Sequence, residues 1–198
     1  MEHLNLALFL LVSAGENAPG IAIAAARFLA QDLVWMLPAG LILGWLRGSS
    51  ATRQALIAAT VAGLTGLLIN QLIGLAWYHP RPFAAGLGRA LIAHAWDSSF
   101  PSDHLTLIWA IASSLALHRQ VRFAGWAIAL LGVPVAWARI YLGLHFPLDI
   151  LGAALVALCS TWLISGQEEQ LIAPLMRLLL PTYRKLFSGF IRKGWVRQ

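Results

Sequence analysis

Charged residues are scarce in this sequence. Asp, Glu, Lys and Arg make up 11% of its 198 residues, and only eight residues are acidic. A soluble domain usually carries about 25% charged residues, so this composition argues against a soluble protein. Hydrophobic residues make up 59% of the chain. Because a bilayer-spanning helix needs about 20 mostly apolar residues, we expect residues 1–198 to form a single membrane-embedded domain, an all-α polytopic bundle of about five to six transmembrane helices.

Cysteine is almost absent. The one thiol, Cys159, lies within the apolar run 153–164, so a single chain cannot hold a disulfide framework or a cysteine metal site. We expect Cys159 to be a buried packing residue. The first 20 residues also lack the positively charged start of a secretory signal peptide, and we expect them to be retained.

The apolar runs predict five spanning cores, at about residues 33–46, 54–77, 102–118, 123–141 and 147–165. We expect the first part of segment 21–46 to be interfacial, because it holds Arg27, Gln31 and Asp32. Residues 1–20 are predicted to be an interfacial segment and residues 167–198 a basic amphipathic tail on the membrane surface. Residues 78–101, rich in Pro, Gly and His, are predicted to form a long loop.

Basic residues fall on one side of this arrangement. Arg47 and Arg53 follow the first span, Arg119 and Arg122 follow the third, and six of the 14 Lys and Arg residues lie beyond residue 175. The positive-inside rule makes this side cytoplasmic. We expect the tail to contact anionic lipid headgroups rather than nucleic acid. The long loop and the connection between the last two spans then face the extracytoplasmic side.

Three clusters of reactive residues lie on that outer side, each at the end of a predicted span. They are His-Pro-Arg-Pro at 79–82, Pro-Ser-Asp-His at 101–104, and the segment 138–149. An ionisable group at membrane depth costs about 2.5 to 3.5 kcal/mol even on the lenient insertion scale, and is therefore a candidate functional residue. The convergence of three such clusters on one side predicts an active site.

The side chains of these clusters suit the binding of a phosphate group. Arg81 and Arg139 supply guanidinium forks for phosphate oxygens. Ser102 supplies a hydroxyl group at the expected N-cap of a helix, where the free N–H groups also favour an anion. These three residues are predicted to form an anion cage.

Two histidines and one carboxylate supply the groups for attack on phosphorus. His145 and Asp149 are four residues apart and therefore share one helix face. We expect Asp149 to hold the imidazole of His145 in one tautomer while the other nitrogen attacks phosphorus. His104 is expected to protonate the leaving oxygen and later to activate water.

The clusters resemble the motifs of the type 2 phosphatidic acid phosphatase superfamily, which are Lys-x6-Arg-Pro, Pro-Ser-Gly-His and Ser-Arg-x5-His-x3-Asp. The match covers residues 81–149. The resemblance implies an enzyme that needs no metal and no cofactor, usually with six transmembrane helices. It also implies roles for six residues: Arg81, Ser102 and Arg139 bind phosphate, His104 is the acid and base, His145 is the nucleophile and Asp149 is its partner.

Three positions depart from the family pattern. Gly74 stands where the lysine is expected, Asp103 replaces the glycine of the second motif, and Ala138 replaces the serine of the third. The first change removes a positive charge from the phosphate cage, and His79 or Arg89 could substitute for it as accessory residues. Asp103 is expected to point aside from the phosphate, since an acidic residue in a first helical turn suits the helix dipole.

Longer segments of the same motifs are similar to the bacitracin-resistance type of undecaprenyl pyrophosphate phosphatase. These segments are Pro-Arg-Pro-Phe, Phe-Pro-Ser-Asp-His and Ala-Arg-Ile-Tyr-x-Gly-x-His-x-Pro-x-Asp. The similarity implies an enzyme of the bacterial inner (plasma) membrane that recycles the lipid carrier of peptidoglycan synthesis. It would hydrolyse undecaprenyl diphosphate to undecaprenyl phosphate and inorganic phosphate at the outer face, through a phosphohistidine.

Two alternatives remain open from the sequence. The first is another lipid phosphate phosphatase, acting on phosphatidylglycerol phosphate, phosphatidate or a lipid A phosphate, because the cage recognises phosphate and not the lipid tail. The second is a non-catalytic lipid transporter or scaffold, although no paired broken spans in two related halves are evident. The implied partners are a polyprenyl diphosphate lipid and membrane lipids, and the oligomeric state is left undetermined.

Overall fold

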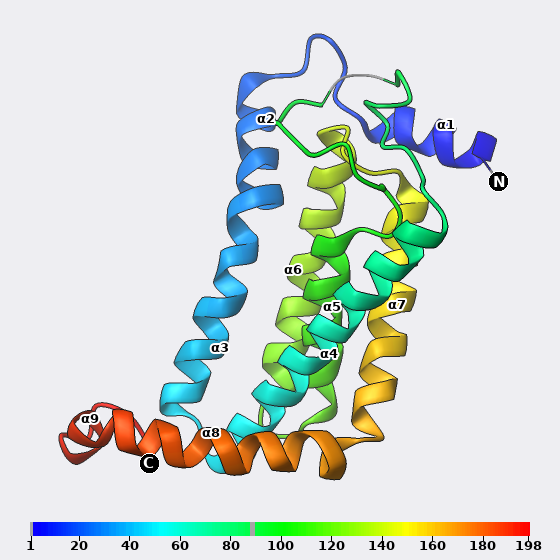
Figure 1. The fold of residues 1–198 in the computed structure, drawn as a ribbon. Helices are drawn as coiled ribbons and strands as arrows, with labels where there is room; N and C mark the ends of the chain where they lie inside the picture. Colours follow the sequence, from blue (N-terminus) through cyan, green and yellow to red (C-terminus); the bar gives the residue numbers. More distant parts are fainter. Residues whose placement is uncertain (1, 88–89) are drawn as a thin grey trace.

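The computed structural model describes residues 2–87 and 90–198, and over these residues all regular structure is helical. Figure 1 shows a bundle of steep helices with one helix lying across its lower end. The prediction of an all-α bundle is confirmed. In chain order the elements are α1 (Glu2–Val12), α2 (Gly20–Arg27), a π-helical turn (Phe28–Asp32), a 3-10 turn (Leu33–Trp35), α3 (Met36–Arg47), α4 (Ser50–Ala76), α5 (Asp103–Leu117), α6 (Arg122–Tyr141), α7 (Pro147–Ser165), a second π-helical turn (Glu168–Ile172), α8 (Ala173–Leu186) and α9 (Ser188–Arg192).

Four helical segments in the described part of the chain are long and apolar enough to cross a membrane: Gly20–Arg47, Ser50–Ala76, Arg122–Tyr141 and Pro147–Ser165. The remaining bundle helix, α5, has only 15 residues. It packs against α4, α6 and α7, so protein rather than lipid surrounds most of its length. The five predicted cores therefore correspond to five helices, one of them short because it is enclosed.

Small residues let α5 and its neighbours approach closely, as is common where membrane helices pack. A Cβ atom on Gly125 of α6 would lie 2.5 Å from the backbone nitrogen of Ala116. A Cβ atom on Gly152 of α7 would lie 2.3 Å from the ring of Phe100. The second contact fixes the chain just before α5 against the first turns of α7, where the third sequence cluster lies.

The first long helix differs from the expectation. The spanning core was expected to begin near residue 33, but the helix is continuous from Gly20 through two irregular turns to Arg47. The charge of Arg27 does not interrupt it, because Nη2 of Arg27 donates a hydrogen bond of 2.6 Å to the carbonyl oxygen of Leu91. The long loop thus supplies a hydrogen-bond acceptor for the exposed side chain of Arg27.

The expectation for Cys159 was wrong. Its side chain is exposed on α7, whereas Ala157 and Ser160 on the same helix are buried in the bundle. An apolar run in a soluble protein marks a buried segment, but in a bilayer the lipid-facing side of a helix is also apolar. The run 153–164 therefore could not identify which face packs inward.

The basic residues that were predicted to share one side do lie at one end of the bundle, together with α8 and α9 (Figure 1). Arg53 is fully buried there. Its Nε donates to the carbonyl oxygen of Trp45 at 2.9 Å and its Nη2 to that of Arg197 at 2.6 Å. The C-terminal segment is therefore tied to α3 and α4. The long loop, α1 and all three sequence clusters lie at the opposite end.

Candidate active site

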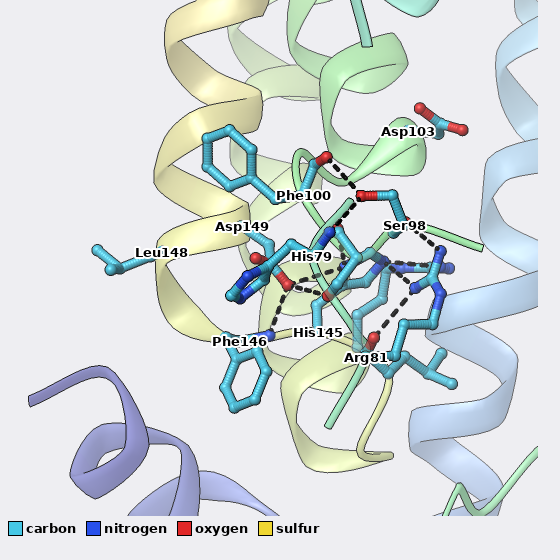
Figure 2. A network of polar contacts seen from close by, with 12 residues as sticks. His79, Arg81, Ser98, Phe100, Asp103, His145, Phe146, Leu148 and Asp149 are labelled. Carbon is cyan, nitrogen blue, oxygen red and sulfur yellow. Dashed lines mark hydrogen bonds and ion pairs between the residues drawn. The ribbon is translucent and has the colours of Figure 1, made fainter. Parts of the chain in front are cut away.

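The site lies where the loop between α4 and α5, the end of α6 and the start of α7 meet (Figure 2). The N-terminal helix α1 supports this corner from outside. Asn5 Oδ1 accepts a hydrogen bond of 3.0 Å from the backbone N–H of Leu148 in the first turn of α7. The ring of Phe9 packs against the ring of Phe146, with 5.3 Å between the ring centroids. The residues around the start of α7 are therefore held from two sides.

His145 is oriented through one ring nitrogen. Its Nδ1 lies 2.9 Å from the carbonyl oxygen of Ser99 and 3.3 Å from Oδ2 of Asp149. Both oxygens accept hydrogen bonds, and we therefore assign the ring proton to Nδ1. The lone pair is then on Nε2.

Two arginines converge on Nε2 of His145. Nη1 of Arg81 lies at 3.1 Å and Nη2 of Arg139 at 3.2 Å. A guanidinium group only donates hydrogen bonds, so both contacts require an unprotonated Nε2, in agreement with the tautomer assigned from Nδ1. The two predicted phosphate-binding arginines thus meet at the atom predicted to attack phosphorus.

Backbone carbonyls hold both arginines in place. Arg81 also donates to the carbonyl oxygen of Leu144 at 3.0 Å and that of Ser98 at 3.3 Å. Arg139 donates to the carbonyl oxygen of Ala30 in the first π-helical turn at 3.2 Å. Fixed guanidinium groups need little rearrangement when they bind charge, which is the condition for strong electrostatic stabilisation.

Burial keeps the imidazole of His145 uncharged. His145 is 1% exposed, and desolvation lowers the pKa of its imidazole well below the usual 6.5. The positive charges of Arg139 and Arg81 lower it further, while the hydrogen bond to Ser99 opposes them. At neutral pH the imidazole is therefore neutral, the form in which Nε2 can attack.

Asp149 is fully buried, and one of its oxygens takes all of its contacts. Oδ2 accepts from the backbone N–H of Phe146 at 2.8 Å, from the hydroxyl of Ser99, and from Nδ1 of His145. Oδ1 has no hydrogen-bond partner in the described part of the chain. The carboxylate thus joins the start of α7 to the loop and to the nucleophile.

Ser102 occupies the N-cap position of α5, as predicted, but its side chain does not cap the helix. Its buried Oγ has no hydrogen-bond partner among residues 2–87 and 90–198, and the same holds for Nε of Arg139. A buried donor without a partner costs about 1–3 kcal/mol. These two donors are the ones that an incoming anion could satisfy.

His104 lies in the first turn of α5 and is half-buried. It is close enough to Arg139, His145 and Arg81 for their charges to act on its imidazole. The predicted acid thus lies within electrostatic range of both predicted cage arginines and of His145. Within the described ranges, no three His, Cys, Asp or Glu side chains are grouped as metal ligands.

Of the predicted accessory residues, Asp103 and His79 make no side-chain hydrogen bond to Arg81 or Arg139 within the described ranges. Asp103 accepts hydrogen bonds from Asn70 at 2.8 Å and Gln71 at 3.3 Å, both on α4, and Figure 2 shows its carboxylate apart from the His145 cluster. The imidazole of His79 packs against two aromatic rings, with its centroid 5.4 Å from that of Trp77 and 5.8 Å from that of Phe146. Arg89 lies outside the described residues.

Three further residues of the loop contact the side chains of the site. Ser99 bonds both His145 and Asp149. Asp97 accepts from Nε of Arg81 at 2.8 Å, and His94 Nε2 lies 3.2 Å from Nη2 of Arg139. No local pattern marks Ser99, because its main contribution is a backbone carbonyl.

The comparisons with known proteins agree with this geometry. The family model described as the PAP2 superfamily matches residues 54–172. YbjG from Escherichia coli K12, which carries the provisional name of an undecaprenyl-diphosphatase, is 37% identical over 198 residues, covering 100% of this chain and 99% of the relative. The undecaprenyl-diphosphatase BcrC from Bacillus subtilis is 36% identical over 149 residues, 75% of this chain and 76% of the relative. The crystal structure of Aquifex aeolicus LpxE superposes with a TM-score of 0.68 at 22% identity, covering 82% of this chain and 95% of that one.

Proposed function

Because this chain belongs to the PAP2 superfamily, we propose that it hydrolyses undecaprenyl diphosphate to undecaprenyl phosphate and inorganic phosphate. The chain is a multi-pass membrane protein. One observation carries the proposal: two guanidinium groups converge on the unprotonated nitrogen of a buried histidine. Paired guanidinium forks match the oxygens of a phosphate group, and a neutral imidazole nitrogen is a nucleophile.

In the first half-reaction, Nε2 of His145 attacks the terminal phosphorus. The bond between that phosphorus and the bridging oxygen breaks, and undecaprenyl phosphate leaves with the electron pair and a proton from His104. Arg81 and Arg139 balance the charge on the phosphoryl oxygens. The unpartnered hydroxyl of Ser102 supports a further hydrogen bond to the same oxygens.

The second half-reaction releases phosphate from the phosphohistidine. His104, now neutral, removes a proton from water as the water oxygen attacks phosphorus, and the bond to Nε2 breaks. Throughout, Nδ1–H of His145 stays bonded to the Ser99 carbonyl and faces Asp149. The carboxylate supports the reaction because it offsets the positive charge of the phosphorylated imidazole.

We place the protein in the bacterial inner membrane with the site on the extracytoplasmic side. The basic residues after α3 and α5 and in the C-terminal segment lie at the end away from the site, and the positive-inside rule assigns such an end to the cytoplasm. Residues 1–20 would then lie in the outer membrane–water interface of this bilayer, and residues 167–198 in the cytoplasmic one. Labelling of a cysteine introduced at Ala85, in a Cys159→Ala background, by an impermeant thiol reagent on intact cells tests this orientation.

Phosphate release by the purified full-length chain in mixed micelles tests the reaction. Undecaprenyl diphosphate should be cleaved faster than phosphatidylglycerol phosphate, phosphatidate or a lipid A phosphate at equal surface density, with or without a chelator. His145→Ala should reduce the rate at least about 10³-fold. The matched control is His118→Ala, because His118 pairs with Glu168 at 3.7 Å at the opposite end of the bundle. Hydrolysis that persists in His145→Ala would refute the assignment of His145 as the nucleophile. Preference for another lipid would refute the assignment of undecaprenyl diphosphate as the substrate.

A further inference from the structure

His94 is in the long loop and contacts the phosphate cage directly. Its Nε2 lies 3.2 Å from Nη2 of Arg139, the same guanidinium nitrogen that lies 3.2 Å from Nε2 of His145. The two imidazole nitrogens are therefore separated by no more than twice that contact distance. A phosphoryl group bound to Nε2 of His145 would have an oxygen within reach of His94.

The contacts of His94 define its tautomer. Arg139 can only donate, so Nε2 of His94 accepts the hydrogen bond and carries no proton. The ring proton is then on Nδ1, which lies 3.3 Å from the carbonyl oxygen of Ala95 and 3.8 Å from Oδ1 of Asp97. His94 is thus neutral while Arg139 donates to it, and a protonated His94 would have acceptors ready for its Nδ1–H.

An anion that binds Arg139 changes this balance. It competes for Nη2 of Arg139 and leaves Nε2 of His94 without its donor. It also adds negative charge beside a group whose pKa is lowered by burial and by the charges of Arg81 and Arg139. Both changes favour protonation of His94, after which Nε2–H can donate to the anion. The remaining charged or titratable groups around His94 are Asp97, His104 and His145.

We propose that His94 is a phosphate-binding residue that takes up a proton when the substrate binds, and so restores the positive charge missing at Gly74. This inference rests on the proposed function for the identity of the anion, but the geometry concerns any tetrahedral dianion in the cage. The protonated imidazole donates Nε2–H to a non-bridging oxygen of the transferred phosphoryl group. Substrate affinity then rises as the pH falls through the pKa of His94 in the complex.

Sulfate is a suitable probe, because it remains a dianion near neutral pH and any proton taken up must come to the protein. Calorimetry on the full-length chain in detergent, in buffers of different ionisation enthalpy, counts those protons. We expect the wild type to take up close to one proton per sulfate between the pKa values of free and bound His94. His94→Gln should lose this uptake and bind sulfate about tenfold more weakly, the loss of one charge-assisted hydrogen bond.

Two further variants keep the result interpretable. His94→Lys supplies a permanent charge, so it should bind sulfate about as well as the wild type without taking up a proton. His118→Gln is the matched control at the far end of the bundle and should behave like the wild type. Unchanged proton uptake or unchanged affinity in His94→Gln would overturn the proposal. Failure of the wild type to hydrolyse undecaprenyl diphosphate would overturn the proposed function alone, since sulfate binding is measured separately.

Discussion

Replacing Asp149 with Asn separates the charge of the buried carboxylate from its hydrogen bonds. All donors to Asp149 reach Oδ2, and Oδ1 has no partner among the described residues. An asparagine with its carbonyl oxygen at the Oδ2 position keeps those donors, and its NH₂ group takes the unpartnered position. The tautomer of His145 should also persist, because Nδ1–H is closer to the carbonyl of Ser99, at 2.9 Å, than to Asp149.

What Asp149→Asn removes is the attraction between the carboxylate and the positive charge on the phosphorylated imidazole. At the observed 3.3 Å between Nδ1 and Oδ2, and an effective dielectric constant of about 20, that attraction is about 5 kcal/mol. We therefore expect kcat for phosphate release to fall by about 10³- to 10⁴-fold. The melting temperature should fall less than in Asp149→Ala, because the variant keeps the hydrogen bonds to Oδ2 and no longer buries an ionised group, and its one cost is an NH₂ group at a position without a partner among the described residues.

Asp149→Ala is the matched comparison. It leaves the hydroxyl of Ser99 and the N–H of Phe146 without their acceptor, each at a cost of about 1–3 kcal/mol, so its melting temperature should fall clearly. A loss of less than about tenfold in kcat for Asp149→Asn would refute the electrostatic role. A fall in melting temperature as large as that of Asp149→Ala would refute the claim that the asparagine keeps the hydrogen bonds.

Three other predictions follow from the site. Since burial lowers the pKa of His145 below 6.5 and the neutral form is proposed to attack, the loss of kcat/KM that comes from protonation of His145 should appear only below that value; Arg81→Gln should move this acid limb to higher pH, measured from pH–rate profiles. Asp103→Leu removes the hydrogen bonds from α4 and should lower the melting temperature while changing kcat/KM less than about threefold, because Asp103 lies outside the cage. Asn5→Ala removes the acceptor of Leu148 N–H, so it should lower the unfolding free energy by about 1 kcal/mol and reduce kcat several-fold; unchanged values in either assay would show that α1 does not position α7.

The helices could be predicted from the sequence because the bilayer imposes a length. The expected cores at 123–141 and 147–165 differ from α6 and α7 by at most one residue at either end, since a spanning helix must keep about 20 apolar residues together. Because lipid is also apolar, the hydrophobic pattern does not show which face of a helix packs inward. Cys159 was misassigned for this reason. The helix also starts well before the expected core, at Gly20, and the hydrogen bond from Arg27 to Leu91 could not be read from the apolar pattern.

The side chains that meet at the candidate site could be predicted because their residue types and spacing are visible in the sequence. His145 and Asp149 are brought together by one helical turn, as their separation of four residues requires. Ser99 could not be predicted in the same way. Its carbonyl reaches His145 only because the loop folds back on α7, and a backbone carbonyl is available at every residue. The conformation of a loop of this length is set by tertiary contacts that no local pattern records.

Gly74 bears both on the missing lysine charge and on the position of the loop carbonyls. A Cβ atom at this position of α4 would lie 3.3 Å from Cβ of Ser98, a tight contact at the start of any lysine side chain. The glycine therefore lets the loop pack closely on α4, and the same segment presents the carbonyls of Ser98 to Arg81 and of Ser99 to His145. Glycine at this position therefore lacks the permanent charge of a lysine but allows the loop to pack closely on α4. A charge supplied instead by His94 would be present only when the imidazole is protonated, so phosphate affinity here should depend on pH in a range where a lysine would not titrate.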